Sequence, residues 1–211
     1  MFPKVLKTAT DQDEPLEFKR LRIDLWETNE GTIDFLNLIF NATLGAEKVL
    51  AKVVFRSYGN DVHAYLARHG MAPQLRGTSS VQDCAILVVM QLLEDGWMTL
   101  FHYRRNVYRQ GIPEPHRSKL LERLEQILEY LNGVKMVHGD FRMANVMLKK
   151  GEEEKALLID FDWAGEAGKV RYPITRSRGF HYPGSPGGCI EATHDREFYE
   201  TWRSEIMTST P

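Results

Sequence analysis

Cysteine is scarce in this chain, since only Cys84 and Cys189 occur among 211 residues. Two cysteines are too few for a disulfide framework or a four-cysteine metal site, and they favour a reducing compartment. An excess of charge of one sign is also lacking, because 27 basic and 29 acidic side chains leave a formal net charge of −2. This balance gives no bulk electrostatic reason to expect a nucleic-acid partner.

The chain also lacks a long hydrophobic run. The longest, CAILVVMQLL at residues 84–93, is about half the length of a membrane span. Residues 1–15 lack the apolar region of a signal peptide. We therefore expect a soluble intracellular protein, in the cytoplasm, with neither a membrane nor a nucleic acid as partner.

The pattern of apolar residues predicts strands mainly in the first half of the chain and helices mainly in the second. The clearest helix is 117–133, where leucines and one isoleucine form a single stripe and Gly133 signals the end. Strands are expected at 16–26 and 85–93, hairpins at 35–55 and 146–160, and shorter helices at 60–70, 96–105 and about 195–206. This order predicts an α+β fold of two unequal parts, which join near residues 91–96.

Polar side chains interrupt two apolar stretches between residues 137 and 165. In HGDFRMAN, residues 138–145, Asp140 could accept a proton from an attacking hydroxyl and Asn145 offers a hard oxygen ligand. In LLIDFDW, Asp160 follows a buried-type strand. Carboxylates in apolar surroundings need a compensating cation, and Mg²⁺ is held by one or two protein oxygens together with phosphate and water. We expect Asn145 and Asp160 to hold Mg²⁺, although an ordinary turn carboxylate at Asp160 remains the alternative.

The two motifs together resemble the catalytic loop, H-x-D-x-x-x-x-N, and the following apolar-Asp-Phe of the protein-kinase-like family. The HGD form is similar to that of aminoglycoside and choline phosphotransferase relatives and of fungal kinase-like domains. The resemblance implies a two-lobe kinase-like fold that uses ATP and Mg²⁺. Its small lobe, an antiparallel β-rich sheet, would be residues 1–93, and its truncated, mainly helical lobe would be residues 94–211. It implies that Asp140 is the catalytic base, that Asn145 and Asp160 are metal ligands, and that His138 anchors the loop. Arg142 would offset charge on the transferred phosphoryl group; a surface ion pair is its alternative.

By the same resemblance, the first lobe should contact the nucleotide. Lys52 lies among apolar neighbours in KVLAKVVF and fits the ATP-binding lysine, although a solvent-facing edge lysine is its alternative. Asp61 is the nearest acid in the next helix and is expected to pair with Lys52. Backbone groups of Gln91 to Leu93 should face adenine. Met90 should border the pocket, with ordinary core packing as its alternative.

Several residues depart from the family pattern. No glycine-rich loop precedes Lys52, Asp162 replaces the glycine of Asp-Phe-Gly, and Gly139 replaces an arginine that reads activation-loop phosphate. We therefore do not expect switching by loop phosphorylation. Asp195 is expected to contact the catalytic-loop backbone.

Two functions remain open on the sequence. The first is an ATP-dependent phosphotransferase that moves the γ-phosphate to a hydroxyl of a protein or a small molecule. The alternative is a pseudokinase or binding module. The intact set Asp140, Asn145 and Asp160 favours the enzyme.

Overall fold

The structure is a computed structural model that describes residues 3–7, 13–21, 38–55, 57–81, 85–107, 111–176 and 181–207. The chain forms two compact units, Met1–Tyr58 with Pro73–Leu93, and Gly59–Ala72 with Glu94–Pro211. Residues 59–72, which the sequence places in the first lobe, make their contacts within the second unit. The lobe boundary after residue 93 stays a prediction.

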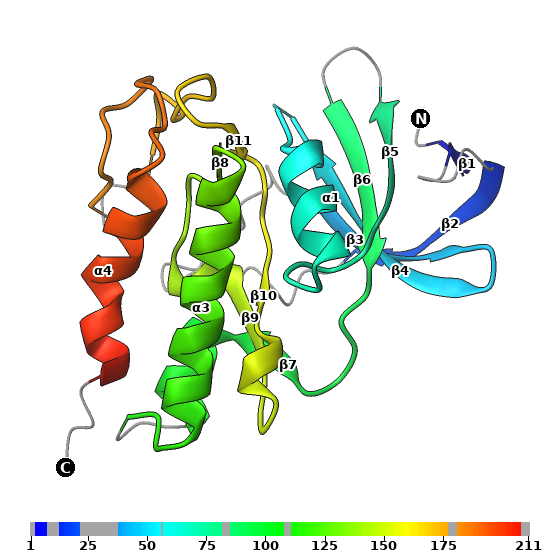
Figure 1. Cartoon of the computed structure of the whole chain (residues 1–211). Coiled ribbons are helices and arrows are strands. Elements are labelled where there is room, and N and C mark those ends of the chain that lie inside the picture. Colours follow the sequence, from blue (N-terminus) through cyan, green and yellow to red (C-terminus); the bar gives the residue numbers. More distant parts are fainter. Residues whose placement is uncertain are drawn as a thin grey trace. The chain divides into compact units, whose positions relative to one another are not determined.

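The first unit is a six-stranded antiparallel sheet with the order β1-β2-β3-β4-β6-β5. The strands are β1 (Val5–Lys7), β2 (Asp13–Leu21), β3 (Leu38–Leu44), β4 (Glu47–Val54), β5 (Leu75–Val81) and β6 (Ala85–Gln91). The sheet curls so that its edge strands β1 and β5 contact each other (Figure 1). Alternate residues of the strands face a core inside this curl, which includes Leu16, Val49, Ala51 and Leu87.

The predicted hairpin at 35–55 is confirmed for its described residues, which are β3 and β4. Leu44 pairs with Glu47, so the strands are joined by a two-residue turn in which Gly45 has a left-handed φ of 55°. The strand expected at 16–26 is present as part of β2, and its last residues, 22–26, lie outside the described residues. Residues 29–37, where a glycine-rich loop was sought, lie outside them as well. The buried strand expected at 85–93 is present as β6.

The second unit contains helices α1 (Asn60–Arg68), α2 (Leu100–His102), α3 (His116–Gly133) and α4 (His194–Met207), with a π-helix, η2 (Tyr103–Val107), and 3₁₀ turns η3 (Met143–Asn145) and η4 (Glu153–Lys155). Its short strands are β7 (Trp97–Thr99), β8 (Met136–Val137), β9 (Val146–Lys149), β10 (Leu157–Leu158) and β11 (Gly165–Glu166). They form a three-stranded sheet, β10-β9-β7, and a pair, β11-β8. Among the described residues, no helix is long and apolar enough to cross a membrane.

Helix α1 ends as the sequence predicts, at Gly70. The amide of Gly70 donates to Ala67 O at 3.0 Å and that of Met71 donates to Leu66 O at 2.8 Å. These two bonds form a Schellman motif, in which the left-handed φ of Gly70, 66°, suits a residue without a Cβ. Leu66 and Met71 are both buried, so the end of α1 is also fixed by apolar contact.

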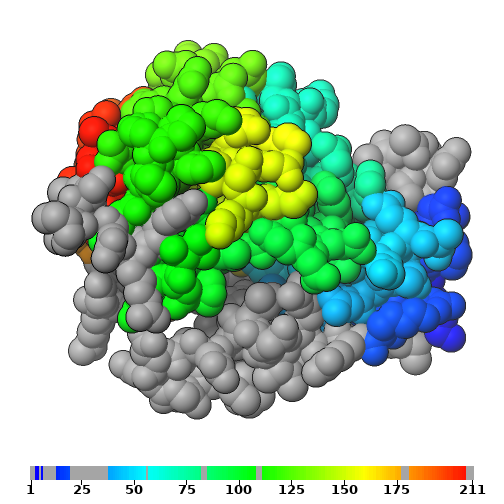
Figure 2. All heavy atoms as spheres, turned by 90° about the horizontal axis from the view of Figure 1, so that it is seen from below, coloured from blue at the N-terminus to red at the C-terminus, as the bar shows by residue number. Residues whose placement is uncertain are grey.

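Helix α3 carries the predicted apolar stripe, and it supports the hairpin that leads to Asp160. Leu120, Leu124, Ile127 and Leu131 of the stripe are buried. Figure 2 shows hairpin β9–β10, in yellow, beside α3, in green. Arg123 of α3 fastens the hairpin, since its Nε donates to the carbonyl oxygen of Ala156 at 3.2 Å.

The helix expected at 96–105 is only partly present. Residues 97–99 instead form β7, because they pair with β9 from Trp97–Lys149 to Thr99–Met147. The Thr99 side chain then accepts a hydrogen bond from the amide of His102 at 3.2 Å and caps α2. Tertiary pairing with β9 thus overrides the local pattern in the first turn.

Candidate active site

The loop that contains Asp140 is held by a carboxylate from α4. The amides of His138 and Gly139 donate to Asp195 Oδ2 at 2.6 Å and Oδ1 at 2.8 Å. The predicted contact between Asp195 and this loop is therefore confirmed. Asp195 is buried, and burial raises its pKa to about 6, although the two hydrogen bonds act in the opposite direction. The loop is fixed at its start by charge-assisted bonds that no local sequence pattern reveals.

Gly139 is required by this geometry. Its φ is 81°, a left-handed conformation that residues with a Cβ rarely adopt. A Cβ at this position would lie 2.8 Å from Ile190 Cδ1 and 3.1 Å from the carbonyl oxygen of Trp163. An arginine does not fit here, which gives a physical reason for the sequence HGD.

Asp140 is buried, with 4% of its surface exposed, and its two carboxylate oxygens differ in their surroundings. Oδ2 accepts a hydrogen bond from Asn145 Nδ2 at 2.8 Å and lies 3.0 Å from Arg142 Nε. Oδ1 is buried and has no hydrogen-bond partner in the described part of the chain. A buried carboxylate oxygen without a partner is costly, so this atom has the environment of a group that acts on an exogenous ligand.

The electrostatic environment favours a carboxyl that can exchange a proton near neutrality. Burial raises the pKa of Asp140 to about 6, the nearby Arg142 guanidinium lowers it, and the charge of Asp160 raises it further. Burial also lowers the pKa of His138 to about 4, so the imidazole is neutral. Its Nδ1 accepts from the amide of Asp140 at 3.3 Å, and its Nε2 lies 2.9 Å from the carbonyl oxygen of Ile159, to which it donates. His138 therefore has the surroundings of the predicted loop anchor.

The structure brings Asn145 close to Asp140 and to the residue before Asp160. Asn145 Nδ2 also donates to the carbonyl oxygen of Asp140 at 2.9 Å. Because both of these bonds use Nδ2, they leave the amide oxygen Oδ1 available as a ligand atom. The amide of Ile159 donates to the carbonyl oxygen of Asn145 at 2.9 Å. Asp160 is therefore the next residue after Ile159, which is hydrogen-bonded to Asn145. The charge of Asp160 raises the pKa of both Asp140 and His138.

Asp160 has a strained backbone. Its φ of 70° is left-handed, a conformation that costs a non-glycine residue of order 1–3 kcal/mol. The next residue, Phe161, is held on two sides, since its ring stacks on His63 at 4.5 Å and meets His138 edge-on at 5.2 Å. The amide of Gly59 also donates to the carbonyl oxygen of Phe161 at 2.9 Å. These contacts over-determine the conformation of Asp160 and compensate for its strain.

His63 is a site-supporting residue that the sequence analysis did not single out. Its spacing to Leu66 and Ala67 placed it on the buried face of α1. The helical spacing of these residues could therefore have predicted that His63 is buried. The stacking partner Phe161 is nearly 100 residues away in sequence, and no local pattern predicts such a contact.

The described residues contain no group of three or more His, Cys, Asp or Glu side chains that could hold a metal. This finding is compatible with Mg²⁺ held by one amide oxygen and one carboxylate, because that ion commonly keeps water and phosphate as its other ligands. The hard oxygens of Asn145 and Asp160 fit a divalent cation that keeps polyphosphate and water as its other ligands.

The nucleotide-contact candidates fall in different units. Lys52, Met90, Gln91 and Leu93 belong to the first unit, whereas Asp61 lies exposed in the first turn of α1 in the second. Lys52 is only 6% exposed and pairs with Val88 of β6, so it is not a solvent-facing edge lysine. Its pairing with Asp61 stays a prediction.

One backbone hydrogen bond limits how Gln91, a predicted adenine contact, could bind a nucleotide. The amide of Gln91 donates to the carbonyl oxygen of Gln74 at 2.8 Å, so this amide is already used within the sheet. A contact between the backbone of Gln91 and adenine would therefore have to use the Gln91 carbonyl oxygen. Met90 is buried in β6.

The raised pKa of Asp140 predicts a pH-dependent stability difference in the metal-free protein. An aspartate whose folded pKa, about 6, lies above its ordinary value of 3.8 destabilises the fold as pH rises through that window. The variant Asp140→Asn should therefore gain about 2 kcal/mol relative to the wild type between roughly pH 4.5 and pH 7. Urea unfolding of both proteins across this range measures the gain, and contributions of His138 and Asp195 largely cancel because both proteins contain them. A difference that does not change with pH would contradict the assigned environment.

Parts of the chain are similar in sequence to known kinases. Residues 75–172 match the lipopolysaccharide kinase (Kdo/WaaP) family. A serine/threonine-protein kinase of zebrafish, Danio rerio, named SBK1, is 32% identical over 85 residues, which are 40% of this chain and 21% of that protein. The match thus spans about a fifth of the length of this curated relative.

Solved structures of kinases share the fold. The granulovirus kinase PK-1 of Cydia pomonella superimposes with a TM-score of 0.66 at 16% identity, covering 91% of this chain and 68% of that one. Vaccinia related kinase 3 gives a TM-score of 0.63 at 15% identity, covering 98% of this chain and 68% of that one. The expected fold class is confirmed, because the curled antiparallel sheet and the helical unit match those of these kinases. The fungal subtype stays a prediction. The chain is thus similar over parts of its length to two kinase families, and it shares its fold with solved kinases.

Proposed function

We propose that this chain is an ATP- and Mg²⁺-dependent phosphotransferase that moves the γ-phosphate of ATP to a hydroxyl group. The observation that carries the proposal is the environment of Asp140. One oxygen of this buried carboxylate is fixed by Asn145 and faces Arg142, and the other has no partner among the described residues. An acceptor hydroxyl that donates to Oδ1 would satisfy it.

In this proposal, Asp140 orients the acceptor hydroxyl and receives its proton. A general base works best when its pKa lies near the working pH, and burial raises the pKa of Asp140 to about 6. Arg142 lies 3.0 Å from Asp140 Oδ2 through its Nε and is partly exposed. Its charge would stabilise the negative charge that spreads over the transferred phosphoryl oxygens.

Asn145 Oδ1 and the Asp160 carboxylate would hold Mg²⁺, which supplies positive charge against the phosphate oxygens when bound. The strain at Asp160 supports this role, since residues held in sparsely populated backbone conformations cluster at functional sites. Lys52, buried in β4, would contact the phosphates, with Asp61 as its proposed acidic partner. Met90 and the backbone of Gln91 and Leu93 would contact adenine.

The acceptor is proposed to be a hydroxyl of a small molecule or a protein side chain. The matched family is named for lipopolysaccharide kinases and the zebrafish relative for serine/threonine kinases, so each class has support. The HGD form of the loop supports the small-molecule class, because it resembles that of aminoglycoside and choline phosphotransferases. The left-handed φ of Gly139 and its packing against Ile190 and Trp163 keep glycine at this position.

The proposal is tested by thermal unfolding with and without Mg²⁺–ATP, followed by a transfer assay. A ligand at 100 times its Kd adds about 2.7 kcal/mol to stability, which corresponds to a rise in melting temperature of about 5–10 °C for a chain of this size. Asn145→Ala should reduce the rise, whereas Glu154→Gln, which removes an exposed carboxylate from the same hairpin, should not.

The transfer assay uses ATP labelled in the γ-phosphate with sugars, amino alcohols and serine- or threonine-containing peptides as acceptors. Label in one acceptor class identifies the substrate type. Nucleotide binding without transfer to any acceptor would favour the pseudokinase. No melting shift at millimolar Mg²⁺–ATP would overturn the proposal.

A further inference from the structure

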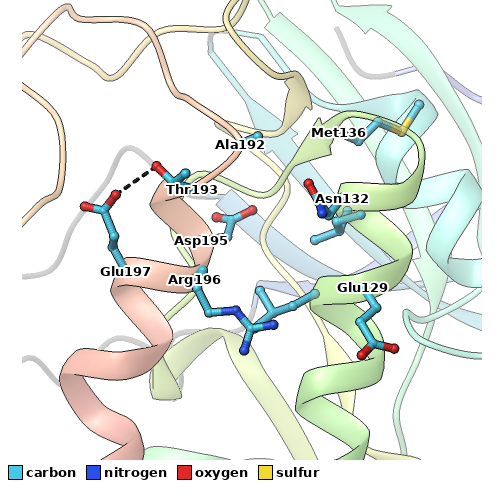
Figure 3. A pocket seen from close by; sticks show the side chains of 10 residues that line it. Glu129, Asn132, Met136, Ala192, Thr193, Asp195, Arg196 and Glu197 are labelled. Atoms are coloured by element: carbon cyan, nitrogen blue, oxygen red, sulfur yellow. Dashed lines mark hydrogen bonds between the residues drawn. The ribbon is translucent and has the colours of Figure 1, made fainter.

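The segment that leads into α4 is held in place within the second unit, in the described parts of residues 163–194. The amide of Tyr172 donates to the carbonyl oxygen of Gly188 at 3.0 Å, so the two sides of the segment are tied together. At the start of α4, Thr193 Oγ1 donates to Glu197 Oε1 at 2.8 Å (Figure 3). Side chains of this segment therefore have defined positions relative to α4 and to the loop that α4 holds.

Three aromatic rings of this segment form a cluster beside the loop that contains Asp140. The centroid of the Trp163 ring lies 6.0 Å from that of Tyr172 and 5.8 Å from that of Tyr182. Trp163 also packs against Gly139, where a Cβ would lie 3.2 Å from the Trp163 Cβ. Tyr172 is buried, whereas the other two side chains are partly exposed. The cluster is therefore a partly exposed aromatic surface next to the proposed catalytic base.

Arg176 places a positive charge on this aromatic surface. Its guanidinium carbon lies 4.4 Å from the centre of the Tyr182 ring and 5.0 Å from that of the Tyr172 ring, and its Nη1 donates to the carbonyl oxygen of Gly184 at 2.8 Å. The rings and the carbonyl hold the guanidinium without neutralising it. In the part of the chain that the structure describes, Arg176 has no carboxylate partner, and its Nε and Nη2 have no acceptor. These two donors form the planar fork that binds two oxygens of a carboxylate or a phosphate.

The Tyr182 hydroxyl lies near both Arg176 and the proposed centre. Burial raises the pKa of this phenol, the charge of Asp140 raises it further, and the charges of Arg142 and Arg176 lower it, so all three charged groups act on the hydroxyl. Among the described residues, the hydroxyl has no hydrogen-bond partner. The surface next to Asp140 therefore combines two guanidinium groups with a phenol that can donate a hydrogen bond.

We propose, on the basis of the proposed function, that Arg176 and the Tyr182 hydroxyl bind an oxyanion group of the acceptor, a carboxylate or a phosphate. Arg176 would donate to two of its oxygens through Nε and Nη2, and Tyr182 would donate to one of them. The hydroxyl that receives the phosphoryl group would lie on the same molecule, at Asp140. This narrows the acceptor to a molecule that carries both a hydroxyl and an anionic group.

Four aromatic probes of similar size test the preference for an anion: the meta isomers of hydroxymethylbenzoate, hydroxymethylphenyl phosphate, benzenedimethanol and hydroxymethylbenzylamine. Ligand-observed NMR titration of the full chain without nucleotide measures their Kd values. At least one of the two anionic probes should bind about fivefold or more tightly than the neutral diol, as expected for charge-assisted hydrogen bonds, and the amine should bind most weakly. The tighter of the two anionic probes shows whether the site prefers a carboxylate or a phosphate. Equal affinity for the anionic and neutral probes would overturn the proposal.

Paired variants locate the anion site. Arg176→Gln should weaken binding of the tighter anionic probe about tenfold, and Arg176→Lys, which keeps the charge but not the fork, should weaken it less. The matched control is Arg171→Gln, because Arg171 is exposed in the same segment and also donates to a glycine carbonyl oxygen, that of Gly187. Its Kd should equal that of the wild type. If a folded Arg176→Gln protein binds the probe as tightly as the wild type does, Arg176 is not the anion ligand.

Tyr182→Phe removes the hydroxyl and keeps the ring that packs on Trp163. It should weaken anionic-probe binding about threefold to fivefold, the effect of one hydrogen bond to a charged group. Tyr130→Phe on α3 makes the same change at a ring that contacts His69 and should leave the Kd unchanged. An effect of equal size in both variants would remove the Tyr182 hydroxyl from the site.

The transfer assay separates the anion site from the proposed function. Arg176→Gln should raise KM for the acceptor about tenfold and leave KM for ATP unchanged. If the anionic probes bind through Arg176 but no acceptor takes label, the anion site stands and the phosphotransferase function fails. If label is transferred and Arg176→Gln changes neither the probe Kd nor the acceptor KM, the function stands and Arg176 has no part in acceptor binding.

Discussion

Asp140→Asn is expected to lower kcat by about 100-fold to 10,000-fold, the range by which a positioned general base accelerates a reaction. Asparagine is nearly the same size, so Asn145 Nδ2 can still donate to an oxygen at position 140. The substitution removes the group that accepts the proton and the negative charge that faces Arg142. Steady-state kinetics with Mg²⁺–ATP and the acceptor identified by the transfer assay give kcat and KM separately.

The matched control is Asp95→Asn, which makes the same chemical change at an exposed position of the second unit. Its kcat should equal that of the wild type. Melting curves of Asp140→Asn should show that the protein is folded, since the variant loses a buried ionised group. Turnover within threefold of the wild type in a folded Asp140→Asn protein would remove Asp140 from the role of catalytic base.

The second large effect is expected at Asp195. Asp195→Ala leaves the buried amides of His138 and Gly139 without their acceptor, and each such group costs about 1–3 kcal/mol. Part of this loss is offset, because burial raises the pKa of Asp195 from 3.8 to about 6, so its ionisation destabilises the fold progressively as pH rises from about 4 to about 6. The net destabilisation should be about 2–4 kcal/mol near pH 5, and smaller near pH 8.

Denaturant unfolding at both pH values measures this loss, with Glu200→Ala on the exposed face of α4 as the control. Hydrogen exchange at residues 138 and 139 adds a local measurement, since their amides should lose protection in Asp195→Ala alone. If the variant is as stable as the wild type near pH 5, α4 does not hold the loop in the way the hydrogen bonds indicate.

Much of the fold could be predicted from periodicity and turn chemistry. Helix α3, the end of α1 at Gly70 and the β3–β4 hairpin follow from the apolar stripe, from a glycine stop signal and from a short turn with glycine. Residues 97–99 could not be assigned from local pattern, because pairing of β7 with β9 across about 50 residues decides their conformation.

The candidate site was predicted unevenly. Asp140, Asn145 and Asp160 are found from sequence because their types and spacing form a compact motif. Their orientation depends on contacts that the motif does not contain, such as the Gly59 amide on Phe161 and the stacking of His63. The left-handed φ of Asp160 also needs this tertiary support, because aspartate adopts this conformation more often than most residues but still only in a small minority of cases.

For Lys52, the sequence predicts burial but not the acidic residue that pairs with it. A lysine among apolar residues predicts burial, and Lys52 is buried in β4. The acid that pairs with it depends on how chain segments far apart in sequence meet, which alternation along one strand does not encode. Asp61 was chosen because it is the nearest acid in the following helix.

Metal binding by Asp160→Asn, compared with the wild type, tests the central claim most directly. Asparagine tolerates a left-handed φ, so the variant should keep its backbone and lose only the charge. Electron paramagnetic resonance with Mn²⁺ in place of Mg²⁺, in the presence of ATP, measures the bound metal. We predict that the wild type and Asp95→Asn bind Mn²⁺–ATP and that Asp160→Asn binds it at least about tenfold more weakly, as expected when a ligand worth about 1.4 kcal/mol or more is lost. Equal Mn²⁺–ATP affinity in all three proteins would contradict the proposed metal site.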